Sequence, residues 1–147
     1  MKYLVFLAAL LSGCATAPAP QQAPAPVVEP AARQPASSGN VAVAALMQSA
    51  RSDTAAGRLA NAAATLERAL RIEPRNPRLW QELARVRLKQ GEYAQAESVA
   101  ARSNSWAGGD SALRAENWRL IAQAREARGD ADGARAALET AGRIGAK

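Results

Sequence analysis

Residues 77–110 read PRLWQELARVRLKQGEYAQAESVAARSNSWAGGD, and this stretch decides the fold. Apolar side chains recur every three or four residues on both sides of Gly91, which is the spacing of one helical face. Asn76 can cap a helix, and Pro77 fits a first helical turn because that turn needs no backbone donor there. The stretch therefore predicts two antiparallel helices, joined at a glycine that tolerates a positive φ angle.

The pattern recurs on both sides of this stretch. Gly57 and Gly91 are 34 residues apart, and the apolar positions around them agree. Gly91 and Gly129 are 38 residues apart, so four extra residues are expected in the connection around Gly108 to Arg114. Small residues at matching positions allow neighbouring helices to approach closely: Ala84, Ala96, Ala122 and Ala134.

These motifs resemble the tetratricopeptide repeat family. Trp80 to Ala84 gives W-x-x-L-A, and Q-G-E-Y follows at the turn; the ending of this unit, S-N-S-W-A-G-G-D, departs from the family pattern. The resemblance implies an all-α solenoid of three helical hairpins, with repeats at about 43–76, 77–110 and 115–147. It also places Trp80 and Trp118 at a packing position within their repeats. A helical-hairpin stack of another repeat class is the alternative.

The N-terminal residues have the features of a targeting segment. Lys2 precedes a nine-residue apolar stretch, which is too short to span a bilayer. Leu11-Ser12-Gly13-Cys14 resembles the bacterial lipobox, which implies a signal peptide at 1–13, cleavage before Cys14, a diacylglycerol on its thiol and an acylated amino group. An ordinary secretory signal followed by a free thiol is the alternative. Ala15 after the cysteine implies sorting to the outer membrane, with the protein facing the periplasm.

A spacer follows the cysteine. Residues 15–40 hold six of the eight prolines of the chain, and proline disfavours helix both at its own position and at the preceding residue. We therefore expect residues 14–40 to be a lipid-anchored cysteine with a disordered Pro/Ala-rich linker, and residues 41–147 to fold. A proline-rich ligand for another protein is the alternative interpretation of the linker.

Composition excludes several classes of function. With 147 residues, no histidine and one cysteine, the chain offers no histidine catalysis, no histidine-ligated metal and no internal disulfide. No motif for an enzyme, a metal or a cofactor occurs, so none of the three is predicted. The net charge of +6 favours nucleic acid, but an exported protein does not ordinarily meet it.

In this family the first helix of each repeat lines a groove that binds peptides or partner helices. Carrying those positions across predicts a cationic groove that suits an acidic peptide or a C-terminal carboxylate. Ordinary solvated surface arginines are the alternative. Trp106 either fills a gap between repeats or marks an exposed contact. The predicted groove residues are Arg51, Arg78, Gln81, Arg85, Lys89, Arg119 and Gln123.

The sequence thus predicts an outer-membrane-anchored, periplasm-facing adaptor that holds an envelope protein. A regulatory activator of a cell-wall synthase or hydrolase is the alternative, and a passive structural tether is a third. The last helix is expected at Asp130 to Ala141 without a further helix to cover it. Its outer face is either polar enough to need no cover, or it is covered by a partner or by a second copy in a homo-oligomer.

Overall fold

The computed structural model describes residues 37–146, which fold entirely as helices and connections. The predicted signal peptide, the lipidation of Cys14 and nearly all of the spacer lie outside the described residues. The six helices are α1 (Ser37–Ala55), α2 (Leu59–Ile72), α3 (Pro77–Lys89), α4 (Tyr93–Trp106), α5 (Ser111–Ala127) and α6 (Ala131–Gly145). The predicted all-α fold of three helical hairpins is confirmed.

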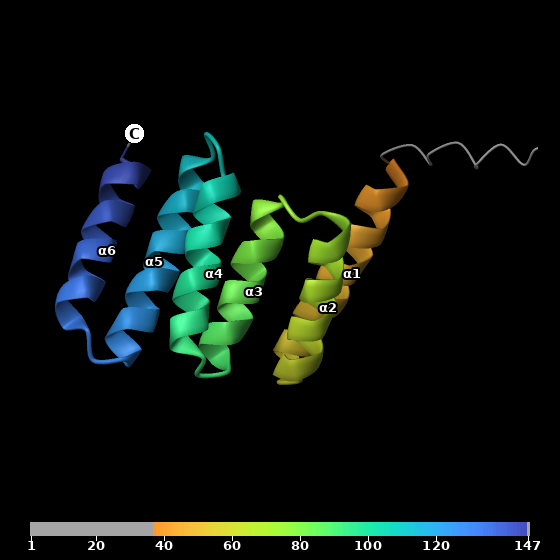
Figure 1. Ribbon diagram of the computed structural model, residues 1–147, viewed down its shortest axis with the longest axis horizontal. Helices are drawn as coiled ribbons and strands as arrows, with labels where there is room; N and C mark the ends of the chain where they lie inside the picture. Colours follow the sequence, from red (N-terminus) through yellow and green to blue (C-terminus); the bar gives the residue numbers. More distant parts are fainter. Residues whose placement is uncertain (1–36, 147) are drawn as a thin grey trace, which may run out of the picture. The chain divides into compact units, whose positions relative to one another are not determined.

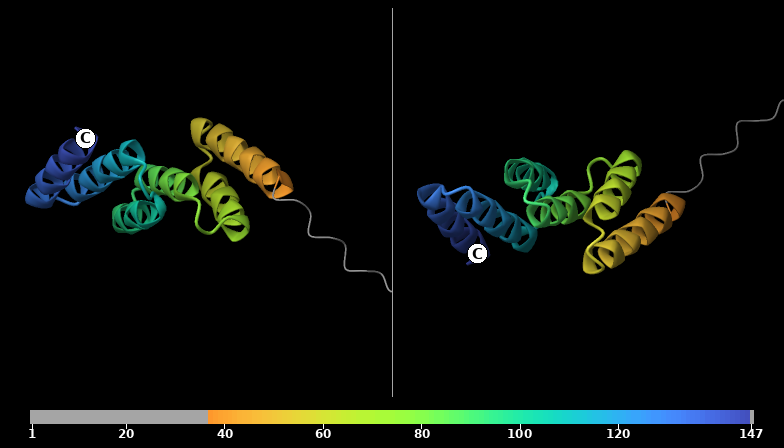
Figure 2. Two further views of the ribbon diagram at one scale, coloured as in Figure 1. Left: turned by 90° about the horizontal axis from the view of Figure 1, so that it is seen from above. Right: turned by 90° about the horizontal axis from the view of Figure 1, so that it is seen from below.

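The hairpins α1/α2, α3/α4 and α5/α6 follow one another in a row (Figure 1). The turns inside the hairpins all lie at one edge of the row, here called the hairpin-turn edge. The connections between hairpins, the start of α1 and the end of α6 lie at the opposite edge, here called the connection edge. The two views of Figure 2 place α2 and α4 on one side of α3, and α1 and α5 on the other.

Local sequence explains the start of α3 and the hairpin turns. The side chain of Asn76 accepts hydrogen bonds from the backbone N of Arg78 at 3.0 Å and of Leu79 at 3.4 Å, with Pro77 in the first turn. Gly91 has a φ of 78°. An L side chain is strained at that angle, so the glycine is what lets the chain reverse there.

The core is built from small and aliphatic side chains between the helices. Leu66 and Leu79 are among the largest fully buried side chains, and they lie in the cluster between the first and second hairpins. The four predicted contact alanines are all buried: Ala84, Ala96, Ala122 and Ala134. Close helix packing on alanine therefore explains the small-residue composition of this unit.

The four extra residues of the third unit lengthen a helix. The prediction that they lie in the connection was wrong: that connection is four residues long, like the one before α3. Asn76 and Asp110 are both N-caps and lie 34 residues apart, while α5 has 17 residues and α3 has 13. Four residues make about one helical turn, so the insertion keeps the inner face of α5 in register.

The last helix extends beyond the predicted end. It continues through Gly145 because nothing in the sequence after Ala141 breaks it, and Gly142 is tolerated within the helix. Leu138 is 52% exposed on this helix, so the outer face of α6 is not wholly polar. No helix of residues 37–146 has the length and apolar character needed to cross a membrane.

Candidate binding groove

A groove runs between α1, α3 and α5 and contains a cavity of about 340 Å³. Its apolar floor consists of Val86, Leu88 and Leu120, of which Val86 and Leu120 are buried. Polar side chains from all three helices surround this floor: Thr54, Glu82, Arg85, Lys89, Glu116 and Gln123. An apolar floor with a charged rim is suited to a short peptide or to one face of a partner helix.

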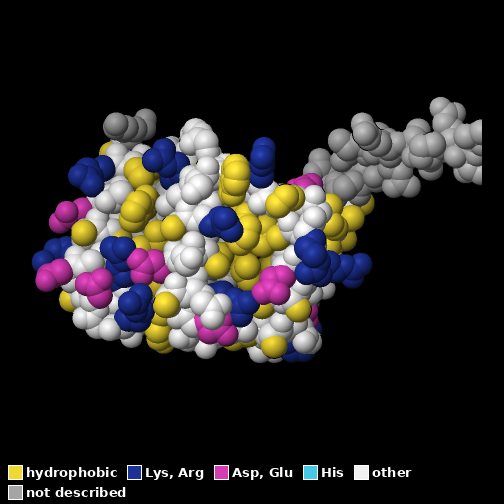
Figure 3. Space-filling view, in the orientation of Figure 1, with side chains coloured by type: hydrophobic (Ala, Val, Ile, Leu, Met, Phe, Trp, Pro, Cys, Tyr) yellow, Lys and Arg dark blue, Asp and Glu magenta, His cyan; other side chains and the backbone are white. Residues whose placement is uncertain are grey.

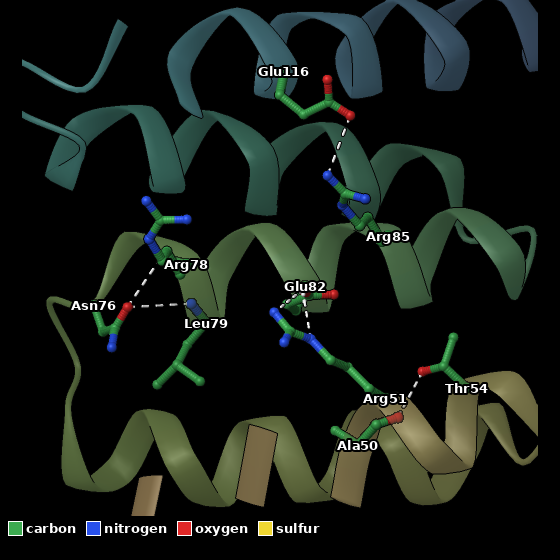
Figure 4. Close-up of polar contacts among 9 residues, drawn as sticks. All are labelled: Ala50, Arg51, Thr54, Asn76, Arg78, Leu79, Glu82, Arg85 and Glu116. Atoms are coloured by element: carbon green, nitrogen blue, oxygen red, sulfur yellow. Dashed lines mark hydrogen bonds and ion pairs between the residues drawn. The ribbon is translucent and has the colours of Figure 1, made fainter. Parts of the chain in front are cut away.

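Ion pairs cross the groove from one hairpin to the next. Arg51 of α1 reaches α3, where its Nε and Nη2 donate to Oε1 of Glu82 at 3.1 and 2.8 Å (Figure 4). Arg85 of α3 reaches α5, where its Nη2 lies 3.2 Å from Oε1 of Glu116. Arg119 binds the other oxygen of Glu116, also at 3.2 Å. Two carboxylates therefore hold three of the predicted groove arginines.

The predicted cationic groove also contains carboxylates, which pair with three of its arginines. Carboxylates lie within reach because the first helices of successive hairpins pack side by side, and arginine is long enough to bridge them. A positive excess nevertheless remains, since Lys89 is exposed and has no carboxylate within ion-pair distance among the described residues. With Lys89 counted, four cations face two carboxylates in and beside the cavity.

The structure divides the predicted groove residues into four sets. Arg85, Lys89 and Gln123 line the cavity, and Arg51 and Arg119 flank it through their ion pairs. Arg78 lies at the connection edge, where it pairs with Asp110 at 3.2 Å. Gln81 is only 8% exposed, and its Nε2 is a buried donor without a partner among the described residues.

Sequence reasoning missed Glu82, which lines the groove, and Asp110, which pairs with Arg78 at the connection edge. A signal for the crossing pairs was present, because Arg51 and Glu82 are 31 residues apart, as are Arg85 and Glu116. That spacing is close to one repeat, so it joins equivalent helices of neighbouring hairpins.

A buried polar network fixes α5 beside α3 and α4, and so sets one wall of the groove. The Oγ of Ser103 in α4 donates to the carbonyl oxygen of Pro77 at 2.7 Å. Asn117 in α5 donates through Nδ2 to Ser103 Oγ at 2.7 Å and to Asn104 Oδ1 at 3.0 Å. Ser103 and Asn117 are both fully buried, so these hydrogen bonds form without competition from water.

Trp80 and Trp118 are partly buried and pack against the two core clusters, as predicted. Trp80 also donates from Nε1 to the carbonyl oxygen of Pro74 at 2.8 Å. Trp106 is different, because 41% of it is exposed and the guanidinium of Arg75 lies 5.2 Å from the centre of its ring. Trp106 is therefore a surface residue at the connection edge.

Residues 37–146 contain no group of three or more acidic or cysteine side chains able to hold a metal ion.

The sequence profile of the tetratricopeptide repeat matches residues 53–116. No curated protein shows significant similarity to the chain. Among solved structures, the globular C-terminal domain of LpoP from P. aeruginosa is 51% identical in sequence and superposes with a TM-score of 0.67. The match covers 68% of this chain and 94% of the LpoP domain. The chain therefore belongs to the tetratricopeptide repeat family, as a relative of the C-terminal domain of LpoP.

Proposed function

We propose that the chain is a lipid-anchored, periplasm-facing adaptor of the outer membrane, and that it holds an envelope protein in the groove between α1, α3 and α5. The observation that carries this proposal is the cavity itself, in which an apolar floor lies beside exposed cations. Tetratricopeptide repeats bind proteins through this side of the solenoid, and the chain belongs to that family.

The charges of the groove favour an acidic segment of the partner. Arg85 is 41% exposed at its side chain, and its guanidinium can bind a second carboxylate beside Glu116, which its Nη2 contacts at 3.2 Å. Lys89 lies one helical turn further along α3 and lines the same cavity. A carboxylate between these two side chains would receive charge-assisted hydrogen bonds from both, while an apolar neighbour in the partner contacts Leu88.

The test is capture of envelope proteins by a chain in which Arg85→Gln and Lys89→Gln are combined. Glutamine is preferable to glutamate here, because a glutamate at position 85 would face Glu116 and disturb the fold. The matched control combines Arg128→Gln and Arg135→Gln, which removes the same charge at exposed side chains of the hairpin-turn edge.

We expect the groove variant to lose the partner while the control retains it, with circular dichroism unchanged for both. Equal capture by the two variants would refute the assignment of the groove.

The second candidate function is regulation, in which the captured protein is a cell-wall synthase or hydrolase and binding changes its rate. The same groove serves both functions, so mapping the contact does not separate them. Turnover of the purified enzyme separates them, because an adaptor leaves the rate unchanged whereas an activator raises it. Neither candidate requires a catalytic group in this chain, and we propose that the chain is not itself an enzyme.

A further inference from the structure

The net positive charge of the described residues lies at the connection edge. Seven arginines lie in its connections or within four residues of its helix ends: Arg68, Arg71, Arg75, Arg78, Arg102, Arg114 and Arg143. The carboxylates in the same positions are Glu73 and Asp110. Elsewhere in residues 41–146, nine cations are opposed by ten carboxylates. The net positive charge of residues 41–146 therefore comes entirely from the connection edge.

Most of these arginines have no carboxylate to neutralise them. Within the described chain, the ion pair of Arg78 with Asp110 is the only one that any of the seven forms. On the face shown in Figure 3, Lys and Arg side chains lie both along the upper part, over the connection edge, and lower down, whereas most Asp and Glu side chains lie lower. A surface of this kind attracts anions, and the attraction weakens as salt is added.

Two shallow hollows on this edge bring arginines together. One, of about 600 Å³, is lined by residues 73–78, among which Arg75 and Arg78 outnumber the one carboxylate, Glu73. The other, of about 740 Å³, lies between the start of α5 and the end of α6 and is lined by Arg114, Arg143 and the hydroxyl of Ser111, with Thr140 positioning Arg143 by accepting from its Nη2 at 3.1 Å. Guanidinium and hydroxyl groups around an open hollow suit phosphate oxygens, which arginine binds bidentately.

Exposed apolar side chains accompany the charge. Trp106 is 41% exposed and Ile72 is 45% exposed, and both end helices at this edge. Arg75 lies over the ring of Trp106, so a cation and an aromatic ring meet at the surface. Tryptophan beside basic residues is typical of protein segments at the boundary between water and lipid.

The chain also enters the folded unit at this edge, because α1 begins there. The 22 residues that separate Cys14 from α1 could span up to roughly 70 Å when extended. A lipid on Cys14 would therefore keep the connection edge within reach of a membrane at all times, at a high effective concentration. The membrane is thus the anionic surface that this edge would meet first.

We propose that the connection edge binds the surface of an anionic phospholipid membrane, with the two arginine-lined hollows receiving headgroup phosphates. The nearness of the connection edge to a membrane rests on the lipid anchor of the proposed function. The positive charge of the edge does not depend on that anchor. The groove lies between α1, α3 and α5, so the edge and the groove can be occupied by different partners.

The experiment uses the mature chain from residue 14 with Cys14→Ser, so that no lipid contributes, and measures sedimentation with vesicles. We expect binding to vesicles that contain phosphatidylglycerol, no binding to zwitterionic vesicles, and release by salt. Combining Arg75→Gln, Arg114→Gln and Arg143→Gln should weaken binding about 100-fold, because each arginine at an anionic surface contributes roughly fivefold. The matched control combines Arg58→Gln, Arg128→Gln and Arg135→Gln, which removes the same charge from the hairpin-turn edge.

The control should bind nearly as well as the unsubstituted chain, and both triple variants should keep their melting temperature. Equal weakening by the two triples would show that net charge alone is responsible, and would overturn the proposal. Absence of vesicle binding by the unsubstituted chain would overturn it too, as would competition by millimolar inorganic phosphate, which indicates a site for the free ion.

The groove variant Arg85→Gln with Lys89→Gln should bind vesicles normally, so a failed adaptor function is distinguishable from a failed membrane contact.

Discussion

The buried pair Ser103 and Asn117 should contribute measurably to the stability of the stack, and its two members should be coupled. Ser103 joins the end of α4 to Pro77, and Asn117 joins α5 to that same hydroxyl. Replacing Ser103 by alanine leaves a buried amide donor with Asn104 as its one remaining partner, which we expect to cost about 1–2 kcal/mol. Replacing Asn117 by alanine removes two hydrogen bonds and opens a small cavity, for about 2–3 kcal/mol.

The sum of these losses should exceed the loss in the double variant. The 2.7 Å hydrogen bond between the two side chains is removed in both single variants and is counted twice in their sum. We therefore expect a coupling energy of about 0.5–1.5 kcal/mol. Combining Ser103→Ala with Asn117→Leu should come within roughly 1 kcal/mol of the unsubstituted chain, because an apolar side chain then needs no partner.

Urea unfolding followed by circular dichroism measures each free energy, and an unchanged slope with urea would show that the unfolded state is the same. A coupling energy of zero would refute the reasoning, since the hydrogen bond would then contribute nothing. A changed slope in Asn117→Ala alone would show instead that the third hairpin unfolds separately.

Three further predictions concern single positions. Gly57→Ala should destabilise the fold by about 1–2 kcal/mol in thermal unfolding, because φ is 74° although no atom lies within 4 Å of the added Cβ. Gly142→Ala should stabilise it by about 0.5–1 kcal/mol in the same assay, because the site is helical and open. Glu116→Gln should tighten binding of an acidic partner in a titration, because it releases Arg85 and Arg119 from the carboxylate; weaker binding would contradict an acidic partner.

The number, order and direction of the helices could be predicted from sequence because each follows from local rules. Periodicity gave the apolar faces, and Asn76 with Pro77 marked a helix start. The place of the four extra residues could not be predicted, because the distance from Gly91 to Gly129 reports an insertion without locating it. A connection and a helix both accept four residues, and only the packing of α5 against its neighbours distinguishes the two.

The position of the groove and several of its lining residues could be predicted from sequence, but the pairing of its charges could not. Arg85 and Lys89 were found because one helical face of α3 could be aligned with the family pattern. Their electrostatic environment depends on which carboxylates the next hairpin presents, and therefore on the sideways packing of helices. Gln81 was misplaced for a similar reason, since the neighbouring helices bury a position that the pattern assigns to the open face.

The central claim is that the groove between α1, α3 and α5 holds an envelope protein, and crosslinking in living cells tests it most directly. A photoreactive amino acid replaces Arg85 in the groove or, as the matched control, Ser98 on the exposed face of α4. The account predicts one discrete protein adduct from position 85 that is lost when Lys89→Gln is added, and no such adduct from position 98. The same adduct from both positions, or an adduct from position 98 alone, would contradict it.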